Sequence, residues 1–536
     1  MEATPPRSAT ARRYPAAALV TPHYLATAAG TDVLARGGNA VDAIVAANLV
    51  LGVVTPYFCG VGGDIFAVVW DGSLHGYLGA GRAPAGATPE AVRNATQGDH
   101  VPPAYRALAG GTRAPGLGPH SVTVPQAVEG WFTLLGRWGT RSFGDVATAA
   151  IGLARDGFEL TTTGCEMFAG AATIYSAFPA WNRRYGGLTP GARLRQPGLA
   201  DLLELLAADG PDAYYRGPVA ESIVETVRAE GGFLDEEDLA AHAGEFCAPL
   251  RANYRDSEIV ELPPPTQGVT ALEILRILDG FELAGMDPAA RQHLIAEATK
   301  LGLLDRDEHV TDPIHMRSAA RELLADDHIV SRRAEIDPES VIDRPAGVPQ
   351  RGGTAYLCAA DSDGLLVSLI QSNFFAFGSG LHVHRWGINL QNRGASFSLD
   401  DRSVNVIAPG KRPMHTLIPA MVMRDDEPWL VFGSMGGDAQ AQVHAQVLAR
   451  RIDDRADIQA AIHAPRWRLE PDDWATMRIE DRVPADVAER LTALGHRVRT
   501  VAPFDSGMGH AHAIELTPGG YAAAVDPRCE GAIGGR

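Results

Sequence analysis

Residues 40–51 restrict the fold of this chain more than any other segment. They follow Gly37-Gly38-Asn39, a typical helix start, and are apolar except for Asp42 and Asn48. A helix that is apolar on almost every face must be covered on all sides by other elements. Strand-like runs occur in both halves of the chain. We therefore expect one layered α/β domain in which this helix is buried.

Strand and helix patterns divide the rest of the chain into three parts. A first strand is predicted over residues 14–20, and a hairpin over residues 65–81 with its turn at Asp71-Gly72. The middle third, from about 126 to 310, has mainly helical periodicity. Within it, Pro263-Pro264-Pro265 is a stiff extended stretch that must lie at the edge of an element.

A hairpin near residue 360 brings two hydroxyl side chains together. The polar, Pro- and Gly-containing residues 330–353 predict a mobile loop. Two strand-like runs follow, at 354–360 and 365–372, joined by Asp361-Ser362-Asp363-Gly364. If Gly364 takes the left-handed position of a three-residue loop, counting outward places Thr354 opposite Ser372.

The charge of the chain excludes several partners. The 536 residues carry a formal net charge of −18. Nucleic acids and anionic membranes attract cationic surfaces, so we expect no nucleic acid, no membrane and a small-molecule substrate. Five cysteines without CxxC spacing predict no disulfide framework, and no apolar run is long enough for a membrane span. We therefore predict a cytoplasmic protein.

Gly353-Thr354 is a candidate site of self-cleavage. Glycine tolerates the strained backbone that would bring the Gly353 carbonyl towards the Thr354 hydroxyl. Attack there would form an ester and then break the chain. The exposed α-amine of Thr354 can then act as the base for its own hydroxyl, so no separate histidine is needed. The alternative is an ordinary junction between a loop and a strand.

Six short motifs resemble the gamma-glutamyltransferase family. They occur in the family's order and cover the chain from residue 15 to the C-terminus. They are Gly37–Ala43, Val53–Pro56 with Gly60–Gly63, Pro263–Gly268, Phe377–Gly380, Gly433–Gly437 and Ala464–Arg466.

The resemblance implies a fold, a nucleophile and an oxyanion hole. The fold is the four-layer αββα sandwich of the N-terminal-nucleophile hydrolases. The nucleophile precedes a strand ending in Asp-x-Asp-Gly, which selects Thr354, with Ser372 as its hydroxyl partner. Backbone N–H groups of Gly436 and Gly437 match the oxyanion hole. Cleavage would give a large subunit, 1–353, and a small subunit, 354–536, interlocked as one structural domain.

The substrate pocket departs from the family pattern. Typical members hold a gamma-glutamyl group with three polar anchors, and the matching positions here are Ala80, Phe374 and Ala395. Arg393 stands where typical enzymes have Gln or Glu beside the substrate amine. A cation there would repel an ammonium group and attract a carboxylate. The alternative is that Arg393 forms a structural or surface ion pair.

Four further residues complete the predicted pocket: Arg82, Asn373, His415 and Thr416. Arg82 lies two positions after Ala80 and would share its face if the strand continues without a bulge. His415 and Thr416 replace the double serine of typical members and are assigned only as pocket lining. His382 with His384, and His510 with His512, lack a recognised ligand spacing, so we expect no metal and no cofactor.

The resemblance leaves the substrate open. Residues 371–375 and 437–440 are similar to a divergent branch that includes oxamate amidohydrolase and cephalosporin acylase-like proteins. We therefore expect a hydrolase or acyltransferase acting on an acidic amide or acyl compound. The alternatives are a glutathione hydrolase with a rebuilt clamp, a carbon–carbon bond hydrolase of an antibiotic pathway, and an unprocessed binding protein. A homo-oligomer is left open.

Overall fold

Two seven-stranded antiparallel sheets form the centre of the molecule. The computed structural model describes residues 10–96, 112–342 and 352–536. The first sheet runs in the order β21 (Ala532–Gly535), β2 (Ala18–Thr21), β10 (Gly353–Ala360), β11 (Leu366–Phe374), β3 (Asp64–Trp70), β4 (Leu74–Gly79) and β7 (Glu245–Cys247). The second runs β1 (Arg12–Tyr14), β20 (Gly520–Ala524), β19 (Ala511–Thr517), β15 (Glu427–Ser434), β14 (Ala420–Arg424), β9 (Ser257–Glu261) and β8 (Leu250–Tyr254).

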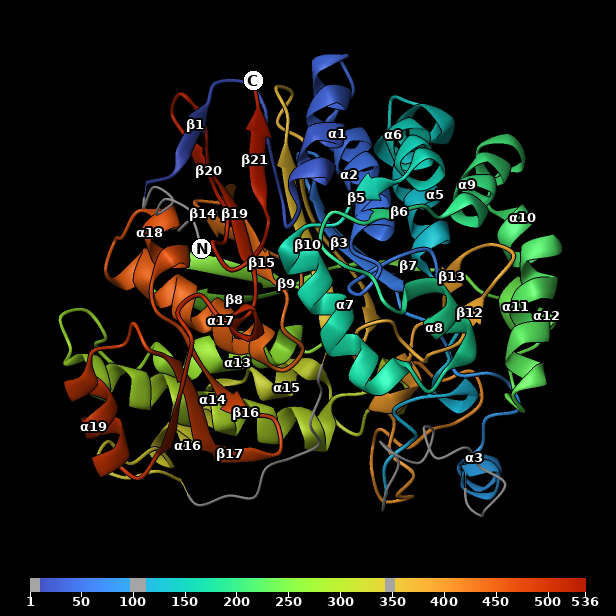
Figure 1. Ribbon diagram of the computed structural model, residues 1–536. Coiled ribbons are helices and arrows are strands. Elements are labelled where there is room, and N and C mark those ends of the chain that lie inside the picture. The colour runs from blue at the N-terminus through green and yellow to red at the C-terminus, as the bar shows by residue number, and fades with distance from the viewer. Residues whose placement is uncertain (1–9, 97–111, 343–351) are drawn as a thin grey trace.

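Helices cover the outer face of each sheet (Figure 1). Those on the first sheet are α1 (Tyr24–Ala35), α2 (Ala40–Val54), α5 (Ala127–Trp138), α6 (Phe143–Asp156), α7 (Thr162–Tyr175), α8 (Pro179–Tyr185), α9 (Pro197–Asp209), α10 (Asp212–Tyr215), α11 (Pro218–Ala229) and α12 (Glu236–Ala240). Those on the second are α13 (Gly268–Leu278), α14 (Pro288–His309), α15 (Ala320–Leu323), α16 (Asp326–Ala334), α17 (Ala439–Leu448), α18 (Ile458–His463) and α19 (Ala485–Ala493). The predicted αββα sandwich is therefore confirmed.

Smaller elements lie at the edges of the sandwich. These are α3 (Pro89–Thr96), the pairs β5 (Phe158–Glu159) with β6 (Arg193–Leu194) and β12 (His382–Val383) with β13 (Ile388–Asn389), and a three-stranded sheet of β16 (Trp467–Glu470), β17 (Asp473–Glu480) and β18 (Arg497–Val501). No helix among the described residues is long and apolar enough to cross a membrane. The five cysteines, all within the described residues, form no disulfide with one another.

The helix α2 is buried along its whole length, as its composition predicted. It begins with a capping box in which Asn39 and Asp42 exchange hydrogen bonds between side chain and backbone. The Asp42 carboxylate also accepts from the backbone N–H of Thr140 and Arg141. The polar residue in this apolar helix therefore ties its start to the loop before α6.

Alternation along β10 places its side chains in two different cores. Tyr356 and Cys358 pack between the two sheets, whereas Leu357 and Ala359 pack against the α2 side. Because β10 and β11 lie in the middle of the first sheet, they are flanked by β2 and β3 from the N-terminal part of the chain. Each of the two sheets therefore contains strands from the part of the chain before Gly353 and strands from the part that begins at Gly353.

Two predicted boundaries differ from the structure. The single strand predicted over 14–20 is two strands, β1 and β2, which belong to different sheets. Pro15 lacks a backbone N–H and interrupts the pairing where the chain crosses between sheets. The loop predicted from residue 330 begins later, because α16 extends to Ala334. Residues 343–351 of that loop lie outside the described residues.

Candidate active site

Thr354, Ser372 and the carbonyl of Gly353 form one hydrogen-bonded chain. The Thr354 hydroxyl donates to Ser372 Oγ at 3.2 Å, and Ser372 Oγ donates to the Gly353 carbonyl oxygen at 2.6 Å. The regular pairing of β10 with β11, in which Ala355 lies opposite Gln371, brings the two hydroxyl groups together. The pairing register then shifts between Gly353 and Ala355. Both hydroxyl residues are 1% exposed. The buried Thr354 hydroxyl is therefore linked through Ser372 to the carbonyl of the Gly353-Thr354 peptide bond.

The backbone after Ser372 is strained. Phe374 has φ +74° and Ala376 has φ +42°, values that side-chain-bearing residues rarely adopt. The Phe374 N–H donates to Ser372 Oγ at 2.7 Å, so this conformation holds the serine hydroxyl in place. Strain of this kind is often retained at functional sites because it positions a reacting group.

Gly436 and Gly437 form a turn between β15 and α17. Their φ angles are +142° and +59°, which favour glycine. Among the hydrogen bonds of the described residues, neither backbone N–H is donated to a protein acceptor. A Cβ built on Gly352 would lie 3.6 Å from the Gly437 Cα. Two unused N–H donors are therefore close to the Gly353-Thr354 junction.

A cleft of about 210 Å³ opens beside this junction. Its lining includes Gly352, Gly436, Ser506 and Arg468. The Arg468 Nε atom is buried and has no partner within the described residues, and burial lowers the pKa of its guanidinium. The residues around the predicted cleavage point thus line a space that contains one arginine, Arg468, and one carboxylate, Asp438. Arg468 had no place among the residues predicted from sequence.

Gln267 connects two walls of the site. Its side-chain amide donates to the backbone oxygens of Thr416, at 2.9 Å, and Gly437, at 3.0 Å. Its carbonyl accepts from the buried guanidinium of Arg306, which also binds Asp438. Gln267 belongs to the Pro263–Gly268 motif, so its position was marked in the sequence. Its partners Thr416 and Gly437 lie 149 and 170 residues further along the chain and gave no local signal.

Arg393 is buried with two donor atoms free. It is 1% exposed, and its Nη1 donates to Thr416 Oγ1 at 3.1 Å. Its guanidinium lies 3.9 Å from the centroid of the Phe374 ring. The Nε and Nη2 atoms have no hydrogen-bond partner in the described chain. Burial lowers the pKa of Arg393 to about 9, opposed by the charge of Asp64.

Phe374 connects Arg393 to the cleavage junction. A Cβ built on Gly352 would lie 3.5 Å from Phe374 Cδ2, on the ring that Arg393 contacts. Of the two forms of the alternative, a surface ion pair is wrong because the Arg393 side chain is buried, whereas a structural pair with Asp64 stays a prediction. The free donors of a buried guanidinium are costly unless a ligand fills them.

His415 is fixed by Asp64 rather than free for a ligand. His415 Nε2 lies 3.0 Å from Asp64 Oδ2, and the Gly81 N–H donates to the other Asp64 oxygen at 3.1 Å. Burial raises the pKa of Asp64 to about 7, which the charge of Arg393 and the Gly81 hydrogen bond oppose. Burial also lowers the pKa of His415. The pair supports the segment that carries Thr416.

Arg82 and Asn373 make their contacts elsewhere. Arg82 Nη1 donates to the Gly410 carbonyl at 3.0 Å and lies 3.6 Å from Asp312. Because β4 ends at Gly79, the strand alternation that would orient Arg82 does not apply. The Asn373 amide donates to the Pro56 carbonyl at 3.3 Å. Among the hydrogen bonds and ion pairs of the described residues, neither side chain reaches Thr354, Ser372 or Arg393.

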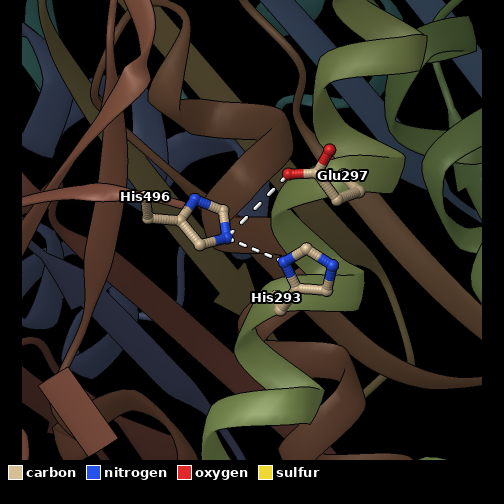
Figure 2. A group of neighbouring side chains, drawn as sticks. All are labelled: His293, Glu297 and His496. Carbon is tan, nitrogen blue, oxygen red and sulfur yellow. Dashed lines mark hydrogen bonds and ion pairs between the residues drawn. The ribbon is translucent and has the colours of Figure 1, made fainter. Parts of the chain in front are cut away.

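Figure 2 shows a buried group of two histidines and a carboxylate that meets the spacing of metal ligands. His293 Nδ1 lies 2.9 Å from His496 Nε2, and His293 Nε2 contacts the Asp337 carbonyl at 2.8 Å. The Lys300 ammonium group donates to Glu297 at 2.7 Å. Since a lysine already neutralises the carboxylate, we interpret the group as a structural network joining α14 to the chain around Asp337.

Two other groups in the described chain have ligand spacing: Glu273, Asp305 and His328, and Asp305, Glu308 and His309. They share Asp305, whose carboxylate is bound by Arg332 in an ion pair. The positive charge of the Arg332 guanidinium therefore balances this carboxylate, and we interpret these two groups as structural as well. His382, His384, His510 and His512 belong to none of these groups.

The fold is that of the N-terminal-nucleophile hydrolases. The structure superposes on that of a cephalosporin acylase from Bacillus halodurans with a TM-score of 0.91 and 34% identity, covering 100% of this chain and 99% of the other. The gamma-glutamyltranspeptidase family model matches residues 26–535. The chain therefore belongs to the gamma-glutamyltranspeptidase family, and the predicted enzyme class, a hydrolase or acyltransferase of that family, is confirmed.

Two curated relatives extend over nearly the whole chain. The glutathione hydrolase-like YwrD proenzyme of Bacillus subtilis is 35% identical over an alignment of 539 positions that covers 96% of this chain and 98% of the relative. The oxamate amidohydrolase proenzyme of Klebsiella pneumoniae is 36% identical over 535 residues, again 96% and 98%. Their names describe precursors of enzymes with different substrates, so membership of the family does not fix the substrate.

Proposed function

We propose that this chain is a precursor that cleaves itself between Gly353 and Thr354 and then acts as a threonine hydrolase or acyltransferase on a small amide or acyl compound with a carboxylate. The products of cleavage would be residues 1–353 and 354–536, which stay interlocked. The hydrogen-bonded chain from Thr354 through Ser372 to the Gly353 carbonyl carries this proposal.

Self-cleavage follows from the geometry of that chain. The Ser372 hydroxyl polarises the Gly353 carbonyl, and Ser372 Oγ accepts the proton of the Thr354 hydroxyl as Thr354 Oγ1 attacks the carbonyl carbon. The C–N bond then breaks, the Thr354 nitrogen takes a proton, and an ester remains. Water then hydrolyses the ester, which frees the Thr354 hydroxyl and the Gly353 carboxylate and leaves Thr354 with the free α-amine formed when the C–N bond broke.

Turnover uses the same hydroxyl with a new base. The freed α-amine of Thr354 accepts the proton of its own hydroxyl, which attacks the substrate carbonyl. The unused N–H groups of Gly436 and Gly437 would bind the oxyanion, and each such donor is worth roughly 3 kcal/mol in the transition state. Water or an amine would then release the acyl group.

Arg393 supports a substrate with a carboxylate. Its free Nε and Nη2 atoms match the two oxygens of a carboxylate, and the positive charge disfavours a substrate ammonium group. One relative is named for oxamate, a small amide that carries a carboxylate and no amine. Five cysteines that form no disulfide with one another support the predicted cytoplasmic location, and a homo-oligomer stays a prediction.

Paired substrates test the role of Arg393. Oxamate and succinamate would be compared with their neutral counterparts, oxamide and succinamide, by the release of ammonia. We expect the acidic member of a pair to have the higher kcat/KM by roughly 10- to 150-fold, the value of one charged hydrogen bond. Arg393→Gln should remove this preference and leave self-cleavage intact.

The alternatives give different results in the same assay. Hydrolysis of glutathione or a gamma-glutamyl anilide in preference to all four amides would favour a glutathione hydrolase with a rebuilt clamp. If the wild type and Arg393→Gln prefer the acidic amides over the neutral amides to the same extent, the proposal that Arg393 binds a substrate carboxylate is contradicted. Cleavage of carbon–carbon bonds in place of amides would favour the biosynthetic hydrolase, and an intact, inactive chain would favour a binding protein.

A further inference from the structure

A second cavity, of about 420 Å³, lies in the helical layer that covers the second sheet. It is enclosed by the start of α14, the π-helix Ala449–Asp453 that continues α17, the strands β16 and β17, and α19. None of its lining residues lines the cleft beside Gly352. Its volume falls within the usual range for a small-molecule site.

One wall of this cavity is apolar. Trp467, Ile479, Val487 and Leu491 line it, and each is less than a tenth exposed. Met286 and several prolines extend the same surface. A wall of this kind fits a hydrocarbon or aryl group, because transfer of apolar surface out of water is favourable.

Three arginines line the rest of the cavity. Arg291 Nη1 binds both oxygens of Asp454 at 2.6 Å, while its buried Nη2 has no partner in the described chain. Arg482 pairs with Glu480, and that carboxylate is shared with Arg528. Positive charge is therefore only partly balanced.

Arg450 is the least compensated of the three. Its Nη2 donates to the Pro465 carbonyl at 3.4 Å, and no ion pair involves it within the described residues. Burial and the nearby charge of Arg291 lower the pKa of Arg450. The Asp454 carboxylate also lines the cavity and opposes this shift, but both of its oxygens bind Arg291. A partly buried guanidinium that shares its counter-ion with another arginine is stabilised by a further anion that can reach it.

We propose that this cavity binds a small organic acid with an apolar tail. Its carboxylate would lie between Arg450 and the free Nη2 of Arg291, and its tail against Trp467, Ile479 and Val487. Arginine donates charge-assisted hydrogen bonds to carboxylates, which suits the unpartnered Nη2 of Arg291 and the guanidinium of Arg450, which forms no ion pair within the described residues. The proposal concerns a site separate from Thr354 and does not depend on the enzyme reaction.

Calorimetric titration of the purified wild-type protein with octanoate tests the site. We expect one octanoate per chain at this cavity, and roughly 10- to 150-fold weaker binding for Arg450→Gln, which removes a charged donor. Octanamide, which has the same tail without the charge, should bind weakly in the same way. Inorganic sulfate alone should not compete, because it lacks the tail.

Three further variants serve as controls. Arg455→Gln makes the same charge change on an exposed residue of the same segment that does not line the cavity, and should leave binding unchanged. Arg393→Gln separates this site from the active site and should also leave it unchanged. If Arg450→Gln does not fold, Val483→Trp fills the cavity from its partly exposed rim and should abolish binding.

Four results would overturn the proposal. They are octanoate binding that survives both Arg450→Gln and Val483→Trp, binding lost in Arg393→Gln, equal binding of octanamide, and no binding at millimolar octanoate.

Discussion

The Thr354 hydroxyl lies 3.2 Å from Ser372 Oγ, across two neighbouring strands in the centre of the first sheet. Because Ser372 also donates to the Gly353 carbonyl, a single serine contacts both the attacking oxygen and the bond to be broken. This relationship underlies the self-cleavage that we propose.

Removing the Ser372 hydroxyl should slow self-cleavage. We expect Ser372→Ala to reduce its rate roughly 100- to 1,000-fold, as the loss of a single donor to a developing oxyanion does. The rate is measured by intact mass at intervals after synthesis. Ser368→Ala is the matched control, because Ser368 is buried on the same strand and bonds to the Tyr356 hydroxyl. Equal cleavage of the Ser372 and Ser368 variants would contradict the assignment.

Gly436→Ala should lower kcat. Its φ of +142° is unfavourable for alanine, and the new Cβ would lie 3.2 Å from the Ala439 Cβ, so the turn that presents the N–H groups must shift. Gly187→Ala is the control, since Gly187 has φ +74° and open space around it. Both variants should lose stability, by about 1–2 kcal/mol for Gly187→Ala. A kcat that fell equally in both would argue against an oxyanion role.

Gln267→Leu should reduce kcat, because the Gln267 side chain holds the backbone of Thr416 and Gly437 in place. It leaves the Thr416 carbonyl without a donor, whereas the Gly437 carbonyl still accepts from the Gln440 N–H. We expect a cost of about 1–3 kcal/mol in the free energy of unfolding. Gln459→Leu removes an equally buried amide, which binds Val525 in another part of the fold. We expect similar stability losses in both, measured by denaturant titration, and a fall in kcat only for Gln267→Leu. An unchanged kcat would leave Gln267 a purely structural role.

Acid should destabilise the protein through its buried histidines. Burial lowers the pKa of His382 to about 4, although its hydrogen bond to Asn389 opposes the shift. Below pH 6.5 the unfolded chain takes up this proton before the folded chain does. The contribution of such a histidine to the free energy of unfolding is therefore complete above pH 6.5. It is lost as the pH falls towards 4, by about 1.4 kcal/mol per pH unit for each such group.

The variant His382→Gln tests this dependence. Glutamine can still donate to Asn389 but does not titrate. The free energy of unfolding, measured by denaturant titration between pH 7.5 and 5, should fall less steeply with acid in the variant than in the wild type. Identical slopes would show that His382 titrates normally in the folded state.

Local sequence was enough to predict some parts of this structure. The apolar composition of residues 40–51 predicted the buried helix α2, and the turn at Asp361–Gly364 was enough to count Thr354 opposite Ser372. These features depend on residues close together in the chain. The four-layer fold came instead from the family resemblance.

Other parts depend on contacts between distant segments. The Gln267 amide reaches Gly437, and Arg393 lies over Phe374, only once both sheets are assembled. Arg82 was expected to continue the alternation of a strand, but that strand ends at Gly79 and the side chain contacts Gly410. At the end of a strand, tertiary packing decides where a side chain points and which residues it contacts. No local sequence pattern specifies this packing.

Intact mass together with N-terminal sequencing of the purified protein, compared with Thr354→Ala, tests the central claim most directly. We predict two fragments, 1–353 and 354–536, the second beginning with Thr354, Ala355 and Tyr356, and an uncleaved Thr354→Ala chain. A wild-type protein that remains a single chain of 536 residues, or a Thr354→Ala variant that is cleaved at the same bond, would contradict it.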